Sequence, residues 1–193
     1  MKSILITFLL VCVTVCSAQA QTSTPPASAG TTASPQSSAP VANPVSTVLR
    51  TILPRQQKNI LAAIDDMPAD KFSYKPTADQ ITFAHLVVHI TQSNNSMCAK
   101  VADIPAPKID PLTDTDSKDK LLAAARTSFD FCTEALGKLD DSKMGESIDF
   151  GSFQSPRAMA AFFLTGGWSD HYGAAAFYLR MNGILPPTAQ PKK

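Results

Sequence analysis

The chain has 193 residues, a formal net charge of +1 and a hydrophobic content of 44%. A near-neutral chain without a basic stripe is not expected to bind nucleic acid. The length leaves room for one ordinary domain with its own hydrophobic core, once the segments at the two ends are set aside.

Residues 1–20 have the features of a secretory signal peptide. Lys2 precedes an apolar run from Ile4 to Cys16, and Ala18-Gln19-Ala20 is the small-x-small pattern that signal peptidase cleaves. The apolar run is short for a membrane span, although a retained anchor is the alternative. We therefore predict an exported protein, periplasmic or extracellular, that meets the membrane only through this segment before cleavage.

Residues 21–43 differ in composition from the rest of the chain. They are Thr, Ser, Pro, Ala, Gly and Gln with no charge, and Val41 is their only large apolar residue. Such a segment buries too little surface to offset its chain entropy, so we predict a disordered linker. The folded domain is then residues 44–187, followed by a short tail at residues 188–193.

Apolar residues recur at three- and four-residue spacing in four segments of this domain, which predicts four helices. No stretch with strand periodicity is long enough to build a sheet. Burying four amphipathic faces together gives an all-α fold, a four-helix bundle. The four predicted helices are residues 45–67, 80–102, 117–139 and 155–183.

Individual residues indicate where the first and last helices begin and end. Pro54 marks either the start of the first helix or a kink within it. Ser155 is predicted to be the N-cap of the last helix, with Pro156 at its first position. Gly183 is predicted to end that helix.

The connection between the second and third helices is long and rich in prolines and aspartates. It can run back along the bundle as a crossover, so that the two helices lie parallel. With a rise of about 1.5 Å per residue, Cys98 and Cys132 are then nearly level, whereas an antiparallel hairpin would separate them. A disulfide in an oxidising compartment and a parallel crossover therefore support each other. The alternative is two buried free thiols.

The three histidines are the candidate site residues. His85 and His89 are four residues apart, so both project from one face of the second helix. With His171 of the last helix they could provide three nitrogens to zinc, nickel or a similar divalent ion. The alternative is that they are ordinary hydrogen-bonded histidines near the edge of the core. No residue can be assigned a catalytic role.

Several segments resemble the DinB-like family, a superfamily of metal-binding four-helix bundles. They are Thr82-Phe83-Ala84-His85-Leu86-Val87-Val88-His89-Ile90, Asp170-His171-Tyr172-Gly173, the run from Tyr178 to Pro187, and the connection that contains Met67-Pro68-Ala69-Asp70 and Lys75-Pro76. The resemblance implies an up-down-down-up bundle with its long crossover after the second helix.

The resemblance also implies a metal site, which departs from the family pattern here. The family places one histidine on the second helix and an H-x-x-x-H pair on the fourth. His89 and His171 match the first and last of these ligands, but the middle ligand falls at Gly167, which has no side chain to bind a metal. Tyr172 and Ala174 also replace the Arg and Gln that often follow.

Three functions remain open from the sequence. The first is an exported protein that binds a divalent metal or a small ligand through His89, His171 and His85. The second is a metal-dependent transferase or hydrolase. The third is a non-catalytic scaffold with a degenerate metal site, and a homodimer is possible.

Overall fold

Across residues 40–191, which a computed structural model describes, the protein is built mainly from four helices. The predicted signal peptide and residues 21–39 of the predicted linker lie outside the described residues. In chain order the elements are α1 (Pro44–Asp66), the 3-10 turn η1 (Ala69–Lys71), α2 (Phe83–Ala102), α3 (Lys118–Gly137), β1 (Ser147–Asp149), β2 (Gln154–Pro156), α4 (Ala158–Met181) and the 3-10 turn η2 (Pro187–Ala189).

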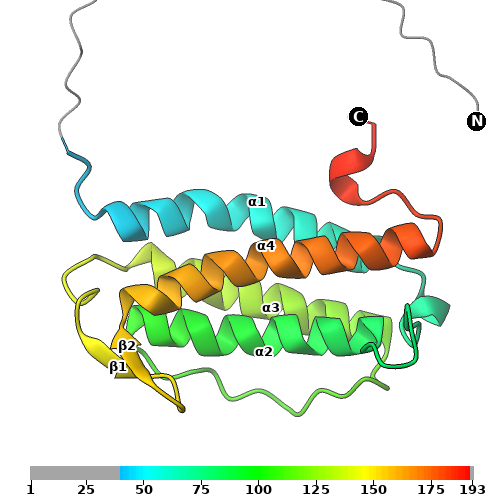
Figure 1. The fold of residues 1–193 in the computed structure, drawn as a ribbon, viewed down its shortest axis with the longest axis horizontal. Coiled ribbons are helices and arrows are strands. Elements are labelled where there is room, and N and C mark those ends of the chain that lie inside the picture. The colour runs from blue at the N-terminus through cyan, green and yellow to red at the C-terminus, as the bar shows by residue number, and fades with distance from the viewer. Residues whose placement is uncertain (1–39, 192–193) are drawn as a thin grey trace, which may run out of the picture. The chain divides into compact units, whose positions relative to one another are not determined.

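The helices follow the predicted up-down-down-up order, as the colours in Figure 1 show. After α2 the chain returns along the bundle before α3 begins, so α2 and α3 run parallel. The helix α4 packs on both α1 and α2. The all-α bundle is therefore confirmed, with a small two-stranded sheet added at one end. Within the described part of the chain, no helix combines the length and apolar character needed to cross a bilayer.

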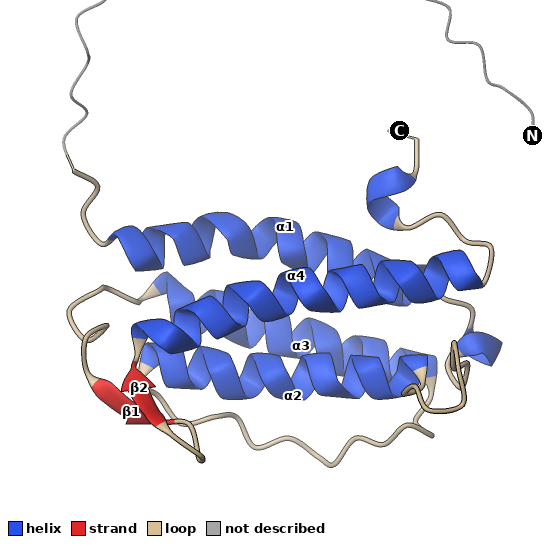
Figure 2. Ribbon diagram, viewed as in Figure 1, coloured by secondary structure: helices blue, strands red, loops and turns tan. Residues whose placement is uncertain are grey.

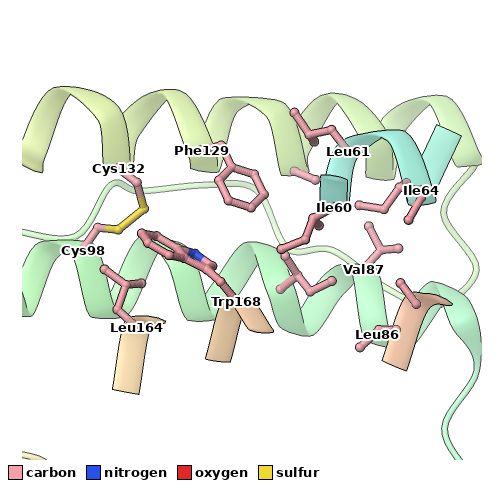
Figure 3. Packing of buried hydrophobic residues seen from close by; sticks show 14 of the residues in the cluster. Ile60, Leu61, Ile64, Leu86, Val87, Cys98, Phe129, Cys132, Leu164 and Trp168 are labelled. Carbon is pink, nitrogen blue, oxygen red and sulfur yellow. A yellow bond between two sulfur atoms is a disulfide. The ribbon is translucent and has the colours of Figure 1, made fainter. Parts of the chain in front are cut away.

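The core runs along the inside of the bundle and includes a disulfide. Cys98 of α2 and Cys132 of α3 are bonded, with their Cα atoms 5.3 Å apart. Trp168 of α4 and Phe129 of α3 lie with their ring centroids 6.4 Å apart, and both side chains are almost completely buried. Figure 3 shows this part of the core and the aliphatic residues beyond it. The disulfide predicted from the parallel crossover is therefore present.

The first helix does not start at Pro54, which was one of the two alternatives offered by the sequence. It begins at Pro44 and continues through Pro54. The turns before Pro54 are held by buried Leu49 and Leu53 and by a cap from a distant residue. Asp141 accepts hydrogen bonds from the backbone N–H groups of Val45 (2.8 Å) and Ser46 (2.9 Å), which have no partner within the helix.

The start of the last helix was predicted wrongly. Ser155 and Pro156 do not cap it but belong to β2, which pairs antiparallel with β1, and Ile148 lies opposite Ser155. Figure 2 shows this hairpin beside the first turn of α4. The helix begins at Ala158, after Arg157. A Ser-Pro pair is a common helix start, but the ladder with β1 holds these residues in an extended conformation.

Arg157 joins the hairpin to the end of α2. Its guanidinium is buried and donates hydrogen bonds to the backbone oxygen of Lys100 (2.6 Å), to Asp103 (3.0 Å) and to Glu146 (3.1 Å). The carbonyl of Lys100 belongs to the last turn of α2, where a cation also compensates the negative end of the helix dipole. This cluster fixes the start of α4 relative to the end of α2, and these two helices carry the candidate site.

Candidate functional site

The candidate site lies where α2 and α4 pass each other in opposite directions. Their register is fixed inside the core, because the indole Nε1–H of Trp168 donates to Asn94 Oδ1 at 2.9 Å. The amide of Asn94 in turn donates to Ser128 of α3 at 3.0 Å. About one turn further along, this register brings His171 of α4 against His89 of α2. Two of the three histidines singled out in the sequence are therefore neighbours.

The rings of His89 and His171 are perpendicular, with an interplanar angle of 87° and centroids 5.0 Å apart. His89 is exposed, whereas His171 is only 6% exposed. The Nδ1 atom of His171 is buried and has no hydrogen-bond partner among the described residues. A buried polar atom without a partner is costly, so it identifies a position where a ligand atom would be stabilised.

The surroundings of His171 keep it neutral. Burial, and to a smaller extent the nearby His89, lower its pKa from 6.5 to about 4, while Asp170 acts in the opposite direction. Asp170 is the preceding residue in the helix, but its side chain is exposed rather than turned toward the ring. At neutral pH the imidazole of His171 therefore has an unprotonated nitrogen that can accept a hydrogen bond or bind a metal.

Gly167 lies one turn before His171 and faces the same ring. A Cβ atom placed on Gly167 would lie 3.6 Å from His171 Cε1, which is ordinary van der Waals contact. The neighbouring Gly166 points elsewhere, because a Cβ there would meet nothing within 4 Å. It lines an open hollow of about 610 Å³ beside α1, together with Arg55 and Ser169. Of these two glycines, Gly167 is therefore the one that borders the histidine pair.

His85 is held by a different partner. Its Nδ1 is 3.1 Å from both carboxylate oxygens of Asp114, and the hydroxyl of Thr82 donates to the same carboxylate at 3.3 Å. Asp114 belongs to the crossover, which passes the start of α2. Asp114 was not among the residues expected at the site. Its only signal in the sequence was the unusual number of aspartates in that connection, because the path of the crossover cannot be read from residue spacing.

The residues brought together can supply two metal ligands. Among residues 40–191 no group of three His, Cys, Asp or Glu side chains is placed to hold a metal ion. Cys98 and Cys132 are bonded to each other and cannot contribute thiolates. The unpartnered nitrogen of His171 and the adjacent imidazole of His89 fit a divalent ion such as zinc only if its remaining ligands come from water or from a bound molecule.

Comparisons with known proteins agree with one another about the fold. The sequence model of the DinB superfamily matches residues 52–170. A DinB-like protein from Bacillus subtilis superimposes with a TM-score of 0.61 at 18% identity, covering 75% of this chain and 99% of that one. A DinB-like protein from Bacillus cereus superimposes with a TM-score of 0.60 at 15% identity, covering 72% and 93%. A comparison with curated proteins gives no significant match.

Proposed function

This chain belongs to the DinB superfamily, and from that premise we propose that it is an exported binding protein whose site is the pair His89 and His171. It takes a divalent metal ion, zinc or nickel, or a small ligand with a hydrogen-bonding group. Such a group would reach the buried Nδ1 of His171, the atom left without a partner. That unpartnered nitrogen, next to a second imidazole, is the observation that carries the proposal.

The buried ring of His171 suits a metal better than a proton. His171 remains neutral at physiological pH because its pKa is about 4, so no proton has to leave before a metal binds. With two imidazoles from the chain, a tetrahedral ion keeps two positions for water or for donor atoms of a small molecule. The proposed ligand is therefore one that can share the ion with the protein, for example through a carboxylate, thiolate or imidazole group.

Two features support the proposed export. The first is the arrangement of charge, apolar run and small residues in the first twenty positions. The second is the disulfide between Cys98 and Cys132, because disulfides persist in oxidising compartments and are rare in the cytosol. In an exported protein the histidine pair would meet the metal ions and small molecules that are present outside the cytosol.

The proposal is tested by isothermal titration of the purified, metal-free protein with zinc and with nickel. We expect binding at micromolar concentrations and its loss in the variants His89→Ala and His171→Ala, because each removes one of the two adjacent nitrogens. His85→Ala is the matched control on the same face of α2. Since its ring is engaged by Asp114, this variant should keep most of the affinity.

Absence of heat at micromolar metal would contradict the metal part of the proposal. An equal loss from all three substitutions would instead show that His85 leaves Asp114 and acts as the third ligand, as the sequence suggested. Circular dichroism of each variant checks that the bundle is intact, because His171 is buried and its replacement leaves a space in the core.

A further inference from the structure

The outward face of α4 is unusually apolar. Five of its large hydrophobic side chains are exposed to solvent, and Phe162 is 70% exposed. In the whole helix only Asp170 and Arg180 carry a charge. The outward face of a surface helix normally carries charged and polar residues, and large exposed apolar surfaces mark interaction sites. The exposed hydrophobic residues are Met159, Phe162, Phe163, Phe177 and Met181.

Most of these residues lie in a single line along the helix, which we call the outer stripe. Its members follow one another at steps of three or four residues, so they project from one side. Every member is exposed, and the stripe lies apart from the side of α4 that carries buried His171. The outer stripe consists of Met159, Phe163, Gly166, Asp170, Gly173, Phe177 and Met181.

The outer stripe has the same order of residue types in both directions from Asp170. Phe163 and Phe177 are equally far from it, and so are Met159 and Met181. Two glycines lie between the aromatic residues and the centre. A second copy turned to run antiparallel would therefore place Phe177 against Phe163 and Met181 against Met159. A two-fold interface has this property, because the same surface on both copies must be self-complementary.

We propose that the partner of this face is a second copy of the chain, and that two molecules form a weak, reversible homodimer through antiparallel α4 helices. The glycines favour close approach, since neither Gly166 nor Gly173 has an atom within 4 Å of where its Cβ would be. The two Asp170 carboxylates meet near the axis, and their repulsion limits the affinity.

The area of the outer stripe is that of a weak, transient complex. A helix of 24 residues is about 36 Å long. With a helix diameter of about 10–12 Å, this one face offers roughly 400 Å² on each copy, against about 800 Å² per partner in a standard interface. This size agrees with a complex of modest affinity.

Part of the interface is already held in place before association. The Phe163 ring packs edge-on against Phe150 (centroids 5.6 Å apart) and Phe153 (6.4 Å), both from the turn of the β hairpin. A side chain that is fixed in the free protein loses less conformational entropy on binding. Phe153 is itself 46% exposed, so it extends the aromatic surface that Phe177 of the second copy would meet.

The proposal is tested by sedimentation velocity of the purified protein between about 1 µM and 1 mM, with variants that exchange the paired aromatic residues for charges. We expect the wild type to show a concentration-dependent dimer. Phe163→Lys and Phe177→Glu should each weaken dimerisation at least tenfold, because each buries a charge without a partner. The double variant with both changes should recover dimerisation, because the introduced lysine of one copy then faces the introduced glutamate of the other in the antiparallel register.

Ile109→Glu is the control, since Ile109 is 44% exposed but lies in the crossover, away from the outer stripe. It should leave the dimer unchanged. A wild type that stays monomeric at 1 mM would overturn the proposal, as would a double variant no better than the single ones. Flotation with anionic phospholipid vesicles gives a further decisive outcome. A monomer that binds vesicles through Phe163 and Phe177 would assign the face to a lipid surface and reject the dimer.

Discussion

At the scale of single residues, Gly167 limits what the histidine pair can hold. It faces the ring of His171 at contact distance and leaves that side of the ring without a donor atom. Because a Cβ fits there without a clash, the position can accept a side chain. The site thus lacks a third protein ligand at a position where the backbone can accept a Cβ atom.

Replacing Gly167 with histidine should therefore raise metal affinity. We expect Gly167→His to bind zinc at least tenfold more tightly than the wild type, because a third imidazole replaces a water ligand. Titration calorimetry measures the change. Gly166→His is the matched control, since a Cβ at Gly166 meets nothing within 4 Å and is turned away from His171. Equal gains in both variants would mean that the added histidine binds metal independently of the pair.

The low pKa of His171 makes the metal-free protein sensitive to acid. In the unfolded chain this histidine takes up a proton near pH 6.5, whereas in the folded chain it does so only near pH 4. Between these values the unfolded state binds more protons. The contribution of His171 to stability is therefore complete above pH 6.5 and is lost as the pH falls toward 4.

We expect the free energy of unfolding to fall by about 2 kcal/mol as the pH is lowered from 6.5 to 4. Urea unfolding at pH 7 and at pH 4, in the presence of a chelator, measures it. A His171→Gln variant should show a shallower loss across the same interval. The carboxylates also contribute in acid, so the difference between wild type and variant, rather than either curve alone, is the quantity to compare. If the two curves are parallel, His171 is not buried as a neutral ring.

Only part of the site could be predicted from the sequence. His89 and His171 could be paired because α2 and α4 are neighbours in the expected fold. The partner of His85 could not, because Asp114 belongs to a loop with no periodic pattern and reaches the start of α2 through tertiary packing alone. The burial that lowers the pKa of His171 likewise depends on the surrounding helices, not on its chain neighbours.

At the scale of elements, regular apolar spacing was a sufficient guide to the helices. The second helix was predicted to start at residue 80, but α2 begins at Phe83, where the Thr82 hydroxyl accepts from the N–H of His85 (2.9 Å). The start of α3 is capped in the same way by Ser117, which accepts from the N–H of Lys120 (3.3 Å). The start of α4 was missed because Ser155 and Pro156 satisfy the helix-start pattern, while the two strands of the hairpin are only three residues long and show no strand periodicity.

The disulfide between α2 and α3 should stabilise the bundle strongly. It closes a loop with a sequence separation of 34 residues, for which the chain-entropy model gives about 3–4 kcal/mol. We expect a double variant, Cys98→Ala with Cys132→Ala, to lose approximately this amount in urea unfolding. A reducing agent should lower the stability of the wild type in the same way and leave the double variant unaffected. Sensitivity of the double variant to reductant would point to another cause.

At the scale of the whole described domain, the topology could be predicted because two independent features agreed. A long connection permits α2 and α3 to run parallel. A disulfide between Cys98 and Cys132 requires the parallel arrangement, because only then do the two cysteines lie at the same level. The outer stripe of α4 could not be predicted from the spacing of apolar residues. Apolar spacing alone marks α4 as buried on all sides, and only the positions of α1 and α2 reveal which side is left to solvent.

The crossover also determines when the fold can be completed. Because α2 and α3 run side by side, α1 packs on α3 and α4, as in the hydrogen bond between Gln56 and Ser169, 113 residues apart in the chain. The first helix therefore completes its packing only when α4 is present, and the core stays open on that side until nearly all of the chain is present. Contacts between such distant segments form later than contacts within helices, and apolar surface stays exposed meanwhile. A chain that must pass through a translocation channel before folding, as proposed for this one, gains from this delay.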